Sequence, residues 1–182
     1  LSGAEAALLI ERYRTAVASP TAAERARDLI GACRSADLAA VYSRAGAEKR
    51  EALRSYRAFT REVVSGEPDA AGQDAFFDAL AASCRASRGT PRAVSVVADF
   101  NGSARAVSVD IALMAELGIP LFVMNGAPRE IAHRIVPEGE SLVPCADEIA
   151  RLRREGASPE ERAALLGYVP DCDGDRGNVV FW

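Results

Sequence analysis

The stretch Ala93–Gly126 constrains the fold most, because it combines a strand, a polar loop, a helix and a second strand. Ala93–Ala98 is a short apolar run with three valines, typical of a strand that is buried on both faces. An apolar helix is expected over Arg105–Leu117, and Gly118 follows it at a position where helices commonly end. A second apolar strand, Leu121–Met124, completes a β-α-β unit.

This unit predicts an α/β fold, a Rossmann-like parallel sheet of about five strands with flanking helices. Two amphipathic helices, over Ala4–Ala18 and from Thr21 to about Cys33, precede the first expected strand, and we interpret them as an N-terminal helical arm. The chain is therefore expected to divide into the arm at residues 1–36, the Rossmann-like α/β domain at 37–156, and a C-terminal helix and tail at 157–182.

The other elements are expected from the same periodicities. Strands are expected at Leu38–Tyr42, at Glu138–Val143 and, at a sheet edge, in the final apolar run 178–182. Helices are expected at 47–64, 74–86, 129–135 and 145–154, and from Ser158 to Leu166.

Composition excludes several classes of protein. Hydrophobic residues make up 49% of the 182 residues, which indicates a globular chain, and the net charge of −4 argues against a surface that coats nucleic acid. No apolar run has the length of a membrane span, and residues 1–18 lack a signal-peptide pattern. Four widely spaced cysteines and a single histidine argue against structural zinc. We expect a cytoplasmic protein with reduced cysteines and no membrane partner.

The polar loop that follows Ala93–Ala98 is the best candidate for a binding site. Glycine allows a backbone to approach a ligand closely, a serine can cap the next helix, and free amides of a first helical turn attract anions. An ordinary N-cap turn explains the same residues equally well. The candidate ligand-binding residues are Asp99, Asn101, Gly102, Ser103, Arg105, Asn125 and Gly126.

Asp110 is the candidate catalytic residue, because a carboxylate inside an apolar helix must be paired or must face a cavity. It could act as a nucleophile or a general base. The alternatives are an exposed edge of the helix or a buried pair with an arginine.

The segment Asp171–Asp175 has the sequence DCDGD, which resembles a calcium loop at first sight. An EF-hand requires its glycine at the sixth position and a further ligand at the twelfth, whereas Gly174 stands fourth. We interpret the segment as a turn and predict no metal site. His133 is interpreted as a histidine of the helix surface or of the packing.

Pro91–Leu152 resembles the distal part of the Rossmann-like nucleotide-binding superfamily of DNA-processing protein A and the "lonely guy" proteins. The resemblance rests on an arginine before the strand, an acid at its end and a polar Gly-Ser segment that opens the helix; these are Arg92, Asp99 and Asn101-Gly102-Ser103. It continues through the next strand, the turn that follows it and a later helix, at Gly118–Val123, Asn125-Gly126, Leu142-Val143 and Ala146–Ile149. It implies a nucleotide or single-stranded nucleic acid as ligand.

Two other families share this topology. Nucleoside deoxyribosyltransferases are similar in placing an acid in the helix after the loop, which would make Asp110 the nucleophile. Serine recombinase catalytic domains are similar to Val41–Arg44 and Phe77–Arg85. All three resemblances imply a nucleotide or nucleic-acid ligand on a parallel sheet.

The leading prediction is a nucleotide- or nucleic-acid-binding protein that holds phosphate or ribose at residues 99–105. One alternative is an enzyme that cleaves or transfers an N-glycosidic bond of a nucleoside, a hydrolase or transferase with Asp110 as nucleophile. A second is a non-catalytic assembly protein, a homodimer or larger homo-oligomer joined through its helical arm and the tail NVVFW. The sequence identifies no cofactor.

Overall fold

The computed structural model of the protein describes residues 2–182, and its chain forms two compact units, residues 1–51 and Ala52–Trp182. The first unit is helical, with α1 (Gly3–Ala18), α2 (Ala22–Ala32) and the beginning of α3 (Ser35–Ser65). Ser2 and Glu5 form a capping box at the start of α1. No residue of α1 or α2 is buried, so the apolar side chains of these helices face outward; they include Leu9, Ile10, Tyr13, Leu29 and Ile30.

The second unit contains a four-stranded sheet in the order β2-β1-β3-β4. The strands are β1 (Ser95–Asp99), β2 (Leu121–Met124), β3 (Ala164–Pro170) and β4 (Gly177–Phe181). β1 pairs in parallel with β2 and β3, whereas β4 is antiparallel to β3. The carboxyl ends of β1, β2 and β3 therefore share one edge of the sheet, where open α/β sheets bind their ligands. We call it the carboxyl edge.

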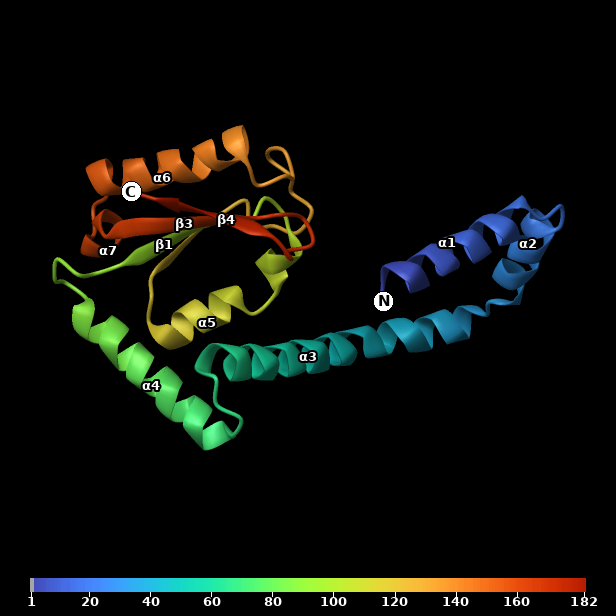
Figure 1. The fold of residues 1–182 in the computed structure, drawn as a ribbon, viewed down its shortest axis with the longest axis horizontal. Helices are drawn as coiled ribbons and strands as arrows, with labels where there is room; N and C mark the ends of the chain where they lie inside the picture. Colours follow the sequence, from blue (N-terminus) through green and yellow to red (C-terminus); the bar gives the residue numbers. More distant parts are fainter. Residues whose placement is uncertain (1) are drawn as a thin grey trace. The chain divides into compact units, whose positions relative to one another are not determined.

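Helices lie on both faces of this sheet (Figure 1). α6 (Val143–Glu155) covers one face, while α5 (Asp110–Leu117) lies on the other and packs on α4 (Ala70–Ser87). Short segments complete the unit: the 3₁₀ turns η1 (Ala104–Val107) and η2 (Gly139–Leu142), and α7 (Pro159–Arg162). The structure is thus mixed α/β with one mostly parallel sheet.

Two hydrophobic clusters hold the unit together. The larger lies between the sheet and α6 and consists of Val97, Cys145, Ile149, Leu152, Ala164 and Val169. The smaller joins α4 to α5 through Phe77, Ala81 and Leu117. Burial raises the pKa of Cys145 to about 12, so this thiol stays protonated and packs as a small apolar group.

The structure confirms the expected strand at Leu121–Met124, the helices at 4–18 and 145–154, and the edge strand in the final apolar run. Gly118 also ends α5 as expected, with φ of 69° in the left-handed region. The expected single helix over Arg105–Leu117 is divided instead into η1 and α5.

The expected strand at Leu38–Tyr42 is wrong, because these residues lie inside α3. A short apolar run fits a helix and a strand equally, and here no proline interrupts the helical segment on either side. The prediction of about five parallel strands is also wrong, since the sheet has four and β4 runs antiparallel.

Three expectations in the C-terminal half are wrong as well. The helix expected from Ser158 to Leu166 ends at Arg162, and β3 begins at Ala164, because pairing with β1 and β4 overrides the local helical propensity. The residues 129–135 form no helix, and the strand expected at Glu138–Val143 is the 3₁₀ turn η2. Within residues 2–182, the helices are too short or too polar to span a membrane.

Gly167 provides a test of the packing between β3 and α6. A Cβ atom at this position would overlap the Cys145 Sγ and would lie 2.9 Å from the Ile149 Cδ1. We therefore expect Gly167→Ala to lower the free energy of unfolding by about 1–3 kcal/mol through overpacking. Urea unfolding followed by the fluorescence of Trp182, the single tryptophan, measures this change.

The matched double variant Gly167→Ala/Cys145→Ala removes the sulfur that the new methyl group meets. Its loss of stability should be smaller than the sum of the two single losses, because the two sites are in contact. Additive losses would contradict this packing.

Candidate functional site

Three loops meet at the carboxyl edge of the sheet: 99–103 after β1, 125–134 after β2, and 171–176 between β3 and β4. Backbone hydrogen bonds join them. Gly102 N–H donates to the Asn125 carbonyl over 2.9 Å, and Arg129 N–H donates to the Gly102 carbonyl over 2.9 Å. Ala104 N–H donates to the Cys172 carbonyl over 3.0 Å. The first loop, with Ala104 at the start of η1, therefore contacts both of the others.

Asp99 is the centre of this arrangement, with a side chain that is fully buried. Its Oδ1 accepts hydrogen bonds from the Asn101 N–H at 3.2 Å and the Asn125 Nδ2 at 2.9 Å. Its Oδ2 lies 3.0 Å from the His133 Nε2. The other ring nitrogen of His133 lies 3.1 Å from the Arg134 carbonyl oxygen. Each ring nitrogen thus lies within hydrogen-bond distance of an oxygen atom, one on Asp99 and one on the Arg134 backbone.

Asn101 fixes the segment that follows β2. Its Oδ1 accepts from the backbone N–H groups of Ala132 and His133 at 2.7 and 3.1 Å. Its Nδ2 donates to the carbonyl oxygens of His133 and Arg134 at 3.0 and 3.4 Å. The helix expected at 129–135 is therefore absent, because the backbone groups of residues 132–134 bond to the Asn101 side chain.

The same loops contain left-handed backbone conformations at residues other than glycine: Asn101 (φ 44°), Asn125 (φ 46°) and Arg129 (φ 71°). Asparagine tolerates this region better than most side chains. Gly102 has φ of 69°, and a Cβ there would lie 2.6 Å from the Glu130 backbone nitrogen. The group that lies close to Gly102 is therefore the backbone of Glu130 in the same chain.

Asp110 forms a buried ion pair at the start of α5. Both of its carboxylate oxygens accept from the Arg105 Nε, at 3.0 and 2.9 Å, and Oδ1 also accepts from the Arg105 Nη2. The Tyr168 hydroxyl donates to Oδ1 at 3.3 Å. The hydrogen bonds with Asp110 raise the pKa of Arg105. Burial, and then the charge of the Asp110 carboxylate, raises the pKa of Tyr168 well above its usual range. The arrangement is the paired arginine and carboxylate that the sequence analysis left open.

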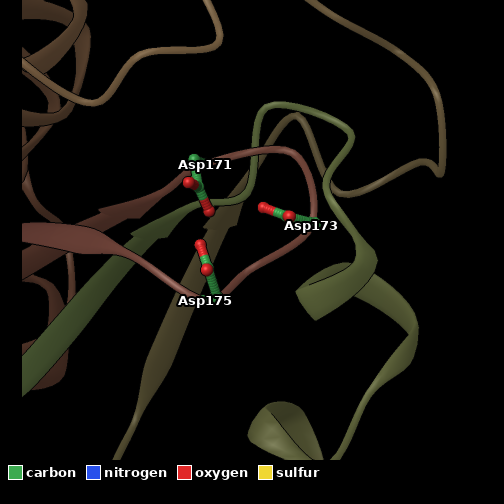
Figure 2. Close-up of side chains that lie close together, drawn as sticks. All are labelled: Asp171, Asp173 and Asp175. Atoms are coloured by element: carbon green, nitrogen blue, oxygen red, sulfur yellow. The ribbon is translucent and has the colours of Figure 1, made fainter. Parts of the chain in front are cut away.

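The loop between β3 and β4 brings three carboxylates together. One oxygen from each of Asp171, Asp173 and Asp175 lies within 4.8 Å of the others, and Figure 2 shows the three side chains directed toward one another from the same turn. Gly174 makes this turn possible with φ of 80°. Arg105 packs against Gly174, since a Cβ at that position would lie 2.7 Å from the Arg105 Cγ.

The charges of this loop are only partly balanced. Burial alone would raise the pKa of Asp171, but hydrogen bonds from Arg176 and Gly174 outweigh burial and hold the pKa below its usual range. Repulsion from Asp173, then burial and repulsion from Asp171, raises the pKa of Asp175. Arg176 lies 2.9 Å from Asp171 and 3.7 Å from Asp175. Among the described residues, Arg176 is therefore the arginine that forms ion pairs with this loop's carboxylates.

The structure brings most of the candidate residues to this one edge. Asp99, Asn101, Gly102 and Asn125 belong to a single hydrogen-bonded cluster, and Gly126 follows directly. The Ser103 side chain is buried, and its hydroxyl has no hydrogen-bond partner among the described residues. Ser103 does not cap η1 through its side chain, as the sequence analysis expected for the helix that follows it.

Sequence reasoning missed His133 and the three aspartates of the last loop. The alternation of Asp171, Asp173 and Asp175 around Gly174 is visible in the sequence, but its spacing does not match an EF-hand. The missing information was that the segment follows a strand parallel to β1, which places it at the carboxyl edge. Comparison of the chain with family models, with curated proteins and with solved structures finds no match.

Asn101→Ala tests whether the cluster holds the loops together. The change removes an acceptor of two hydrogen bonds and a donor of two more, so we expect the free energy of unfolding to fall by about 2–3 kcal/mol. Urea unfolding measures the loss, and amide hydrogen exchange should show faster exchange at Ala132 and His133.

Asn178→Ala is the matched control, because that asparagine is exposed and donates a single side-chain hydrogen bond, to Pro137. Its effect should stay near or below about 1 kcal/mol. Equal losses in the two variants would show that Asn101 has no special role.

Proposed function

We propose that this protein binds a divalent cation at Asp171, Asp173 and Asp175 and, together with it, a phosphate-bearing small molecule of the nucleotide type. The observation that supports the proposal is the convergence of three carboxylates within 4.8 Å at the carboxyl edge. Hard cations such as Mg²⁺, Mn²⁺ and Ca²⁺ prefer oxygen ligands of this kind. A cation would also relieve the repulsion that raises the pKa of Asp175.

A phosphate group is the natural second ligand of such a cation. Mg²⁺ is commonly held by one or two carboxylates together with substrate phosphates, because it retains open or water-filled positions. The position at the ends of parallel strands supports the same conclusion, since ligands of open α/β sheets bind there. The nucleotide rather than a nucleic acid is favoured because the cluster is acidic, and a long polyanion would be repelled by it.

The neighbouring residues have complementary roles in this proposal. Arg105 is held by Asp110 and lies against Gly174, so its charge is fixed beside the aspartate loop. The Ser103 hydroxyl has no hydrogen-bond partner among the described residues. Ser103 immediately precedes Ala104, whose N–H donates a hydrogen bond to the Cys172 carbonyl in that loop. The Asp99–Asn101–His133 cluster gives the surrounding loops a fixed conformation and is saturated by its own hydrogen bonds.

Catalysis by Asp110 on an N-glycosidic bond stays a prediction. Both oxygens of this carboxylate already accept from Arg105, which makes it a positioning residue for that arginine in the proposal. The Rossmann-like character of the sheet, the helical arm and the homodimer also stay predictions. The unburied apolar side chains of α1 and α2 are the feature that favours assembly.

Asp173→Asn tests the cation site. We expect titration calorimetry with MgCl₂ and MnCl₂ to show saturable binding to the wild-type chain and roughly tenfold or weaker binding to the variant, because one anionic ligand is lost. Binding should also weaken as the pH falls toward the raised pKa of Asp175, since protons then compete for that carboxylate.

Asp147→Asn is the control, because Asp147 is an exposed aspartate on α6 outside the cluster. It should leave cation affinity unchanged. Absence of binding to the wild-type chain at millimolar cation would overturn the proposed function.

Nucleotide binding is tested by amide chemical shifts. Adenosine and guanosine monophosphates, added with MgCl₂, should shift the signals of Gly102, Ser103 and Gly174, and EDTA should reverse the shifts because the phosphate contact depends on the cation. Short single-stranded DNA should cause smaller shifts. Unmoved signals with every nucleotide would contradict the ligand class, and shifts with DNA alone would replace it by nucleic acid.

A further inference from the structure

The opposite edge of the sheet contains a second site, at the amino ends of β1 and β3. A cavity with a volume of about 320 Å³ lies there, lined by the turn before β1 and by α6 and α7. Its lining residues are Gly89, Thr90, Pro91, Ala93, Arg153, Pro159, Arg162 and Ala163. A small recess of about 10 Å³ adjoins it and shares Gly89, Ala93, Pro159 and Ala163. We call the cavity and its recess the amino-edge pocket.

Three arginines line this pocket: Arg153 and Arg162 in the cavity and Arg88 in the recess. Arg153 Nη1 donates to the Ala164 carbonyl at 2.9 Å, and Arg162 Nη1 donates to the Gly156 carbonyl at 2.7 Å. Arg88, which lines the recess, donates through Nε to a carbonyl at 3.1 Å. Carbonyl partners fix a guanidinium without neutralising it. Among the ion pairs of residues 2–182, none involves these arginines.

The recess contains a second, independent feature, a buried hydroxyl. Ser95 lines it and is 1% exposed, and its hydroxyl has no hydrogen-bond partner among residues 2–182. A buried hydroxyl without a partner is unfavourable by about 1–3 kcal/mol, so such groups are normally satisfied. The recess has room for about one oxygen atom or one water molecule. Glu160 at the rim of the recess is the one carboxylate in the lining, and it is exposed.

We propose that the amino-edge pocket binds a small phosphate-type oxyanion, with Arg153 and Arg162 contacting the anion and the Ser95 hydroxyl donating to an oxygen that enters the recess. Guanidinium groups recognise phosphate through charge-assisted hydrogen bonds, and their attachment to backbone carbonyls reduces the entropy lost on binding. The site contains no cation-binding cluster, so its affinity is independent of divalent metal. This property separates it from the cation-dependent site proposed at the carboxyl edge.

The experiment is a titration of the full chain with inorganic phosphate, followed by amide chemical shifts in EDTA, with chloride added to keep the ionic strength constant. We expect saturable shifts at Gly89, Ala93 and Ala163, with Gly102 and Gly174 unmoved. The double variant Arg153→Gln/Arg162→Gln should weaken binding roughly tenfold or more. Arg154→Gln, an exposed arginine of α6 outside the pocket lining, is the control and should bind as the wild-type chain does.

Ser95→Ala distinguishes a ligand contact from a structural role. Because the hydroxyl has no partner in the fold, its removal should leave the melting temperature unchanged or higher while phosphate binding weakens severalfold. Absence of shifts at the amino edge, shifts confined to Gly102 and Gly174, or equal phosphate affinity in the double arginine variant would each overturn the proposal. A Ser95→Ala chain that loses stability but not affinity would remove Ser95 from the site.

Discussion

The buried carboxylate of Asp99 imposes the main constraint on the carboxyl edge of this protein. A fully buried charge must be met by donors, because the penalty for leaving it unpaired is large. The donors come from three places in the chain, Asn101, Asn125 and His133. Meeting this one requirement therefore fixes the loops after both β1 and β2, and it explains why left-handed conformations gather there.

The last loop of the sheet differs in that its charge is left incompletely balanced. Asp99 and Asp110 each have dedicated partners, and Asp171 accepts hydrogen bonds from Gly174 and Arg176, whereas Asp173 and Asp175 repel each other. A cation at this loop would relieve the repulsion that remains. This difference in how the acids are paired, more than the number of acids, supports the proposed cation site.

The two edges of the sheet bring different charged groups together. Three carboxylates converge in one loop of the carboxyl edge, and three arginines that donate to backbone carbonyls line the pocket at the amino edge. The parallel pairing separates these two groups of side chains. The carboxyl ends of β1, β2 and β3 lie at one edge of the sheet, and their amino ends lie at the other. A metal-dependent site and a metal-independent anion site can thus occupy one small unit without competing for residues.

The sequence by itself determined the elements whose signals are local: the β-α-β unit, the glycine that ends α5, the helix α6 and the polar loop that begins at Asp99. It could not determine that Leu38–Tyr42 is helical or that 164–170 is a strand, because short apolar runs fit both periods and only pairing decides between them. It also could not connect Asn101 to 132–134 or the three aspartates to the edge that bears Asp99. Those contacts join residues far apart in the chain, and only the parallel pairing of β1 with β2 and β3 brings them together.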